Sequence, residues 1–266
     1  MSRVRIAIAA LAALALSLFA FAGPASAQDA RIHLIHGIPD TDVDVEANGD
    51  NVFESFSFGD TQDLSALAGA TLSGLKVKAA GTDTVAIDAG DVTLPSSGNT
   101  TVIAHLDADG NPTLSIFTND TSTTEAGEGR LVVRHTAAAP NVDIKANGDV
   151  AFANVANGAE GSADLPAGTV TAEVVPAGAD DPVVIGPADL PVNEGEALIV
   201  YAVGSLDDGN LSVLTESITG LHSTPNQVNT GTSPVETGLG AATTAALLGT
   251  VLLAGGGSVA LARRSR

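Results

Sequence analysis

The sequence has no cysteine and no tryptophan, and its 266 residues include one tyrosine and one methionine. Without cysteine there are no disulfides and no thiolate metal sites, so a folded unit must depend on its hydrophobic core. Few aromatic rings are available for stacking on sugars. Phosphate-binding loops, dinucleotide fingerprints and the Gly-x-Ser-x-Gly elbow of hydrolases are also missing. The sequence therefore favours a protein that is not an enzyme and needs no cofactor.

Basic residues are scarce. The chain has 11 Lys and Arg against 31 Asp and Glu, a formal net charge of −20. Five of the arginines lie at the two ends, so residues 28–238 keep six basic residues and all 31 acids, a net charge of −25. Such a surface repels nucleic acid and anionic lipid headgroups. We expect a soluble acidic region with no nucleic-acid partner.

The N-terminal residues have the order of an export signal. Two arginines precede the apolar run from Ile6 to Ala22, and the small residues Ala25-Ser26-Ala27 follow. Charged, apolar and small-residue segments in this order are typical of a cleaved signal peptide. The sequence predicts a signal peptide over residues 1–27, with cleavage before Gln28.

The C-terminal residues suggest a membrane anchor. Residues 239–262 carry no charge and precede the basic tail 263–266. A helix of this length, at about 1.5 Å per residue, can cross a hydrocarbon core of roughly 30 Å. The arginines would stay on the cytoplasmic side. Residues 222–238, rich in Thr, Ser, Asn and Pro, predict a flexible stalk. We therefore expect a single-pass protein of the cell membrane with its N-terminal domains outside.

This order of linker, apolar segment and arginines also resembles a cell-wall sorting region. The Leu-Pro-x-Thr-Gly motif of such regions is absent, and only Thr230-Gly231 and Thr237-Gly238 keep its last two residues. The departure favours membrane anchoring over covalent attachment to the wall.

An internal match divides the remaining chain in two. His36 and His135, Asp44 and Asp143, and Asn48 and Asn147 all share an offset of 99 residues. Because this period is longer than that of solenoid repeats, it predicts duplicated domains. We place them at residues 28–124 and 125–221, with the polar segment 118–129 as their connection.

The sequence of each repeat predicts β structure. Apolar residues alternate with charged ones in Val43-Asp44-Val45-Glu46-Ala47, and an Asn-Gly pair suited to a type I′ hairpin follows. The predicted class is all-β, with two tandem immunoglobulin-like or transthyretin-like antiparallel β-sandwiches. The one helical candidate is Leu64 to Ala68. Further expected strands cover 75–79, 84–87, 101–106 and 114–118 in the first repeat, and 170–175, 183–185, 197–203 and 211–216 in the second.

The motif from His135 through Ala139-Pro140 and Val142-Asp143 to Asn147-Gly148 resembles the opening of the DUF4397 family of bacterial surface proteins. The first repeat matches less closely, because Pro39 is shifted relative to His36. The likeness extends over nearly all of residues 30–218. It implies an exported or envelope-attached β-sandwich, commonly in tandem, and it implies no activity.

Asp40, Asp42 and Asp44 are candidate calcium ligands, since calcium prefers several carboxylate and carbonyl oxygens. The spacing departs from an EF-hand loop, because Val45 and Asn51 occupy the positions of its glycine and its bidentate acid. On a strand, the three aspartates would instead form one solvated outward face. Both interpretations stay open at this stage.

His36 and His135 occupy equivalent positions after an apolar strand. We expect each to be bonded to backbone rather than to a metal, since zinc needs three or four converging ligands. Phe53, Phe56 and Phe58 could form an aromatic binding strip, although a core role is simpler. The expected function is a non-catalytic, membrane-anchored envelope protein displaying two acidic sandwiches. The alternatives are a calcium-dependent surface adhesion module and an uncharacterised hydrolase.

Overall fold

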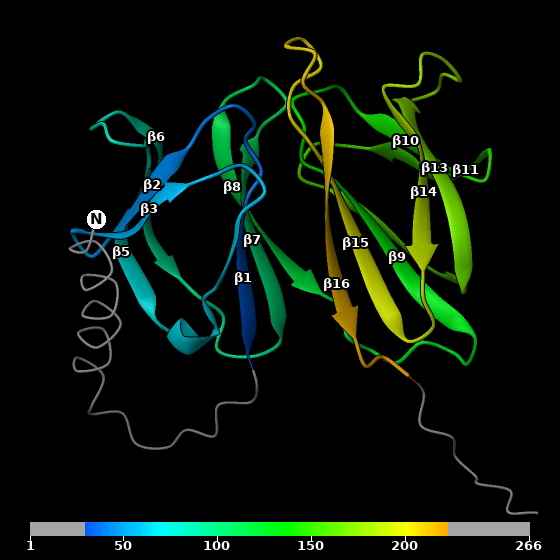
Figure 1. Ribbon diagram of the computed structural model, residues 1–266, viewed down its shortest axis with the longest axis horizontal. Helices are drawn as coiled ribbons and strands as arrows, with labels where there is room; N and C mark the ends of the chain where they lie inside the picture. The colour runs from blue at the N-terminus through cyan, green and yellow to red at the C-terminus, as the bar shows by residue number, and fades with distance from the viewer. Residues whose placement is uncertain (1–29, 223–266) are drawn as a thin grey trace, which may run out of the picture. The chain divides into compact units, whose positions relative to one another are not determined.

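The computed structural model describes residues 30–222, and its regular structure is β-strand apart from one short 3-10 helix (Figure 1). The prediction of an all-β fold is confirmed. The predicted signal peptide, the predicted membrane segment and the stalk beyond His222 lie outside the described residues. Within the described range, no helix is long and apolar enough to span a bilayer.

The first half of the described chain forms two four-stranded sheets, ordered β4-β1-β7-β8 and β3-β2-β5-β6 (Figure 1). The predicted helix at Leu64 to Ala68 is a single turn, η1 (Ser65–Leu67). The strands are β1 (Arg31–His36), β2 (Val43–Ala47), β3 (Asp50–Phe56), β4 (Thr61–Asp63), β5 (Thr71–Ala79), β6 (Val85–Thr93), β7 (Asn99–Leu106) and β8 (Pro112–Asn119).

The second half has the same arrangement, with sheets ordered β12-β9-β15-β16 and β11-β10-β13-β14. Each strand corresponds to the strand eight places earlier, so we call the two halves the first and second repeat. The strands are β9 (Glu128–His135), β10 (Val142–Ala146), β11 (Asp149–Val155), β12 (Glu160–Pro166), β13 (Gly168–Pro176), β14 (Ile185–Val192), β15 (Glu196–Val203) and β16 (Ser212–Thr219).

The sequence suggested antiparallel sheets, but two pairs of strands in the structure are parallel. β1 pairs with β7 in parallel, and β9 pairs with β15 in the same way. Parallel neighbours need a long crossover between them. Here the crossover contains the facing sheet, since the chain leaves β1, builds β2, β3, β5 and β6, and returns at β7.

The predicted hairpins are confirmed. Asn48 and Gly49 have φ angles of 56° and 85°, and Asn147 and Gly148 have φ angles of 52° and 90°. Two consecutive residues with positive φ define the type I′ turn, whose twist matches that of the flanking strands. These turns join β2 to β3 and β10 to β11.

Each repeat has its own hydrophobic core between its two sheets, and a third cluster lies between the repeats. In the third cluster, Ile35, Ile103 and Phe117 of the first repeat pack against residues of the second. Those partners are Val132, Ile199, Tyr201 and Val203. All eight residues of β7 are buried, and all of β15 except its first residue are buried. The described residues thus fall within one compact unit.

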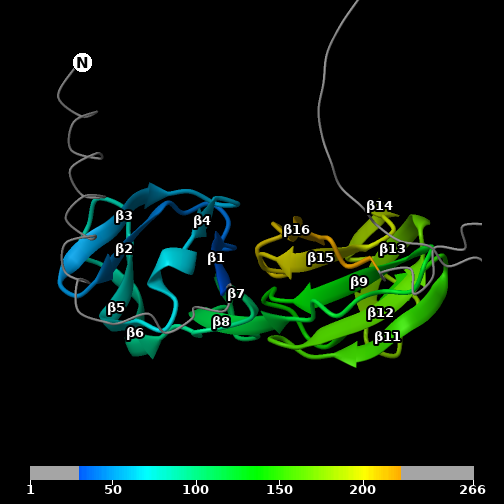
Figure 2. The same cartoon turned by 90° about the horizontal axis from the view of Figure 1, so that it is seen from below.

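Figure 2 shows how this contact is made, with β1 and β7 on the side of the first repeat that meets β15 and β16. The outward faces of the sheets β4-β1-β7-β8 and β12-β9-β15-β16 therefore pack against each other. We refer to this contact as the inter-repeat interface.

The connection between the repeats is tied down by hydrogen bonds. β8 ends at Asn119 and β9 begins at Glu128, so the connection is shorter than predicted. The guanidinium of Arg130 donates to the backbone carbonyl of Asp120 at 3.1 Å and to that of Ser122 at 3.3 Å. Thr124 is 2 % exposed, and its hydroxyl donates to the carbonyl of Glu128 at 3.0 Å.

The two repeats differ at one edge. β12 pairs with β9 along seven residues, whereas β4 pairs with β1 along three before the chain turns into η1. In the second repeat, the ring of Phe152 lies so close to Gly161 that an added Cβ would sit 2.3 Å from its Cγ. The register places Gln62 at the equivalent position of the first repeat, where Phe53 corresponds to Phe152. Gln62, an exposed residue, thus stands where the second repeat has the glycine that Phe152 covers.

We predict that Gly161→Ala destabilises the protein by about 1–3 kcal/mol, because the new methyl group would displace the Phe152 ring. The measurement is the free energy of unfolding in urea. The matched control is Gln62→Ala, an exposed position in the first repeat, expected to change stability by less than about 0.5 kcal/mol. If both substitutions changed the free energy of unfolding by the same amount, the close contact between Gly161 and Phe152 would not distinguish the two repeats.

Candidate functional site

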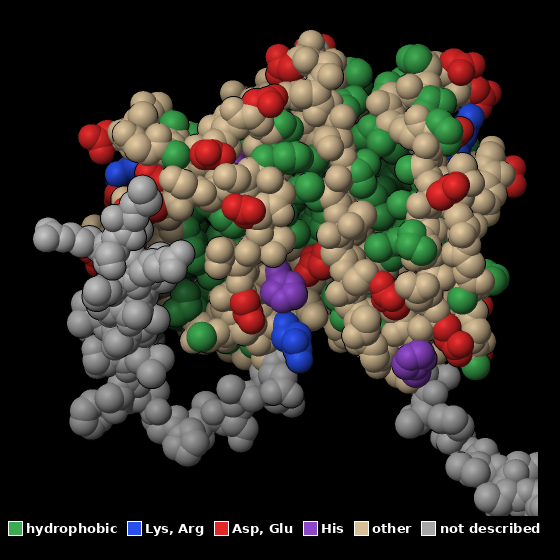
Figure 3. Space-filling view, viewed as in Figure 1, with side chains coloured by type: hydrophobic (Ala, Val, Ile, Leu, Met, Phe, Trp, Pro, Cys, Tyr) green, Lys and Arg blue, Asp and Glu red, His purple; other side chains and the backbone are tan. Residues whose placement is uncertain are grey.

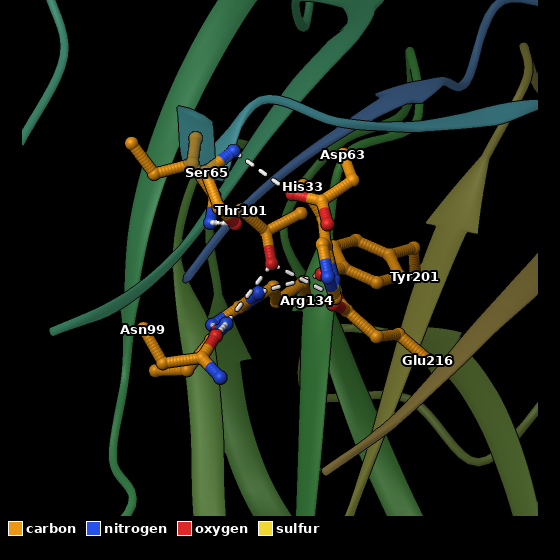
Figure 4. A network of polar contacts seen from close by, with 10 residues as sticks. His33, Asp63, Ser65, Asn99, Thr101, Arg134, Tyr201 and Glu216 are labelled. Carbon is orange, nitrogen blue, oxygen red and sulfur yellow. Dashed lines mark hydrogen bonds and ion pairs between the residues drawn. The ribbon is translucent and has the colours of Figure 1, made fainter. Parts of the chain in front are cut away.

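A network of polar side chains crosses the inter-repeat interface (Figure 4). At one end, the carboxylate of Glu216, on β16, accepts three hydrogen bonds. The His33 Nδ1–H donates to Oε1 at 2.6 Å, and the hydroxyls of Thr101 and Tyr201 each donate to Oε2 at 2.8 Å. His33 and Thr101 belong to the first repeat, whereas Tyr201 belongs to the second. One carboxylate therefore joins both repeats.

At the other end of the network lies Arg134, on β9, with a 1 % exposed side chain. Its guanidinium donates to Glu160 Oε2 at 2.8 Å, to the Tyr201 hydroxyl oxygen at 2.7 Å and to Asn119 Oδ1 at 2.7 Å. It also lies over the ring of Phe117, 4.3 Å from the centroid. Because a buried cation is costly unless paired and hydrogen-bonded, these contacts account for its position in the interface.

Asn119 closes the network into a ring. Its Nδ2 donates to the Thr101 hydroxyl oxygen at 3.0 Å and to Asn99 Oδ1 at 2.7 Å. Hydrogen bonds thus run from Arg134 to Glu216 by two routes, one through Tyr201 and one through Asn119 and Thr101. Each buried side-chain nitrogen and oxygen of the ring has at least one hydrogen-bond partner, so the ring satisfies the polar groups it buries.

The two faces of the interface are complementary position by position. The strand registers make Arg134 equivalent to Ile35, Tyr201 to Ile103 and Glu216 to Phe117. In the opposite sense, the polar Thr101 and Asn119 of the first repeat correspond to Ile199 and Ile218 of the second. Sequence reasoning missed all of these residues. The available signal was the 99-residue offset, since these are outward strand positions at which the two copies differ in polarity.

The chemistry open to this network is restricted by burial. Thr101 and Tyr201 are both 0 % exposed. Burial raises the pKa of the Tyr201 phenol, so it serves as a neutral hydrogen-bond donor. The Thr101 hydroxyl donates to the Glu216 carboxylate, whereas in the Ser–His and Cys–His pairs of hydrolases the nucleophile donates to a histidine. The His33 side chain, 36 % exposed, reaches a surface groove of about 440 Å³. Arg31, Asn99 and residues 217–221 also line this groove.

The predicted histidines are buried and bonded to backbone, as expected. His36 Nε2 donates to the carbonyl of Thr41 at 2.7 Å, and its Nδ1 accepts from the amide of Ile38 at 3.4 Å. His135 Nε2 donates to the carbonyl of Pro140 at 3.0 Å. Within the described residues, His135 Nδ1 has no hydrogen-bond partner. Burial lowers the pKa of both rings, so both are held neutral.

The three candidate calcium ligands have different surroundings. Asp44 is 9 % exposed, and its carboxylate accepts from the amides of Ser55 and Gly81, each at 2.9 Å, which hold its pKa below the ordinary range. The expectation of one solvated face is therefore wrong for Asp44. Asp40 accepts from Asn210 Nδ2 at 3.0 Å, and Asp42 is exposed. Between residues 30 and 222, no three His, Asp or Glu side chains lie close enough together to hold a metal ion.

The three phenylalanines do not form one strip. Phe53 and Phe56 pack in the core of the first repeat, whereas Phe58 packs against the cluster at the inter-repeat interface. Phe53 and Phe56 also line an apolar cavity of about 240 Å³ between the sheets of the first repeat.

We predict that Glu216→Ala lowers the free energy of unfolding by about 2–4 kcal/mol, because it leaves the Thr101 and Tyr201 hydroxyls buried without their acceptor. Urea unfolding followed by circular dichroism measures this loss. Glu54→Ala, on the exposed side of another edge strand, is the control and should cost less than about 0.5 kcal/mol. A loss no larger than that of the control would contradict an essential role for the network.

Stability should also fall with acid. The pKa values of His36, His105 and His135 are lowered mainly by burial, so at mildly acidic pH the unfolded chain binds more protons than the folded one. This contribution is complete above the ordinary histidine pKa of about 6.5 and is lost as the pH falls through the lowered values. We expect urea unfolding to show lower stability at pH 5.5 than at pH 7.5, and a smaller difference in His36→Gln. A stability independent of pH over this range would refute the expectation.

Comparison with known proteins gives a family and no activity. No curated protein matches the chain. Residues 30–145 match the family described as "Domain of unknown function (DUF4397)". The match covers the first repeat as far as β10 of the second, and does not extend over the second repeat as a whole. The motif resemblance noted in the sequence is thereby confirmed for the first repeat, and the chain carries, over residues 30–145, a domain of the DUF4397 family.

Proposed function

We propose that this chain is an exported, non-catalytic protein of the cell envelope, whose two repeats form one rigid acidic body held outside the membrane. The observation that carries the proposal is the inter-repeat interface. It buries the polar groups that could perform chemistry, since Thr101, Arg134 and Tyr201 are each no more than 1 % exposed. Their hydrogen bonds connect the repeats to each other, which is a structural role.

We also propose that each repeat is an immunoglobulin-like or transthyretin-like β-sandwich. Two four-stranded sheets facing each other across an apolar core are typical of immunoglobulin-like and transthyretin-like sandwiches. Such domains commonly serve as rigid modules outside cells. The export signal over residues 1–27 and the anchor over residues 239–262 support this location on their sequence pattern alone.

The surface charge supports display outside the cell and not binding to nucleic acid. Acidic side chains are spread over the face shown in Figure 3, where basic side chains are few. Four of the six basic residues between the terminal segments form ion pairs with acids, namely Lys78, Arg130, Arg134 and Lys145. The remaining charge is negative, so the body should repel other acidic surfaces and remain soluble.

The proposed location is tested with the full chain in a bacterial host. We expect the mature protein to begin at Gln28, to fractionate with the membrane and to be degraded by protease added to intact cells. A variant that ends at Gly238 should appear in the medium, and a variant lacking residues 1–27 should stay inside the cell. A full-length chain that keeps its first residues and resists external protease would contradict the proposal.

The non-catalytic role is tested with an activity screen for esterase, glycosidase and peptidase substrates. We expect no turnover above that of a blank preparation. Turnover that disappears in His36→Gln or His135→Gln would contradict this part of the proposal, because those rings would then be catalytic.

A further inference from the structure

The first repeat contains an apolar cavity between its two sheets. Its volume is about 240 Å³, and every side chain that lines it is hydrophobic. The wall draws on both sheets and on η1. Its members include Phe53, Phe56, Leu64, Leu67, Ala104 and Ile116.

The cavity reaches the surface at the edges of the sandwich. Two of its lining residues are among the most exposed large hydrophobic residues of the described chain, namely Val52 on β3 at 41 % and Ile116 on β8 at 48 %. Both strands are edge strands of their sheets. A small molecule could therefore enter between the sheets without separating paired strands. Hydrophobic side chains are visible in recesses of the surface in Figure 3.

The second repeat provides an internal comparison. The equivalent space, lined by residues such as Ile144, Val200 and Ala202, has a volume of about 30 Å³. The edge difference described above accounts for the contrast. In the second repeat, β12 continues along β9, and Phe152 covers Gly161. In the first repeat, η1 replaces the end of that strand, and Phe53 lines the cavity instead.

An empty apolar cavity lowers stability in proportion to its volume, because its lining atoms lose contacts that they would otherwise make. An apolar cavity of roughly 150 Å³ stays dry and accepts benzene, a molecule of six carbons. At the same cavity volume per carbon atom, the cavity of about 240 Å³ in the first repeat would accept a molecule of about ten carbons. Since no polar side chain lines the cavity, a charged ligand would have to bury its charge without a charged partner.

We propose that the first repeat binds a small, uncharged, apolar molecule of about ten carbon atoms between its sheets. The net charge of −25 over residues 28–238 further disfavours anions such as fatty-acid carboxylates. The second repeat, whose equivalent space is filled, serves as the structural partner. This inference goes beyond the proposed envelope role, and either can fail without the other.

The test uses the full chain with naphthalene as the probe, and 2-naphthoate as its charged analogue. Titration calorimetry and the melting temperature are measured in one lipid or detergent preparation, so that partition into it is the same for all variants. We expect saturable binding of naphthalene at one site, a melting temperature that rises with its concentration, and no binding of 2-naphthoate.

Two variants fill the cavity and one serves as the matched control. Ala104→Leu and Ala89→Leu add carbons to the wall, and each should weaken naphthalene binding by at least about tenfold. Ala188→Leu makes the same change on β14 of the second repeat and should leave the affinity within about twofold. Circular dichroism melting establishes that each variant is folded. The proposal is overturned if the wild-type chain shows no saturable site, or if folded Ala104→Leu and Ala89→Leu bind naphthalene as tightly as Ala188→Leu does.

Discussion

The carboxylate of Glu216 is the contact on which the arrangement of the two repeats depends. It accepts hydrogen bonds from His33 and Thr101 of one repeat and from Tyr201 of its own. Such charge-assisted bonds are stronger than neutral ones, and a buried acceptor cannot be removed without leaving its donors unsatisfied. The cation of Arg134 completes the ring through Asn119. Apolar packing around Phe117 and Ile199 adds to this contact between the repeats, while the polar ring fixes how the two sheets are aligned.

This arrangement divides the molecule into parts with different tasks. The two inner sheets are buried on both faces along β7 and β15, so their side chains are fully committed to packing. The outer sheets face solvent on one side, and the apolar core of the first repeat is loosely filled beside η1. The strands β1 and β7 take part in both regions, since Leu34 and Ala104 line the cavity whereas Ile35 and Ile103 pack in the interface. Packing between the repeats and the cavity thus use opposite faces of one sheet.

The sequence predicted the local features well, because they depend on neighbouring residues. The Asn48-Gly49 and Asn147-Gly148 turns follow from the positive φ that their positions require. The alternation of apolar residues in β2 and β10 likewise marks a buried face. Alternation does not reveal whether the polar face is also buried, so the sequence did not single out Thr101 and Asn119. The parallel pairing of β1 with β7 was missed for a related reason, since nothing within either strand encodes its distant neighbour. Asp44 was interpreted as a solvent-facing residue or a calcium ligand, although its carboxylate accepts hydrogen bonds from the amides of Ser55 on β3 and of Gly81.

The mismatch between the duplicated faces has a consequence for how many modules such a chain can join. A copy of the first module would present no carboxylate to Thr101, and a copy of the second would present neither an imidazole nor a threonine hydroxyl to Glu216. Each module therefore complements the other kind and not itself, although equivalent sheet faces of the two repeats meet in the contact. Within residues 30–222 this face of each repeat is already covered by the other, so a third repeat could not dock through it.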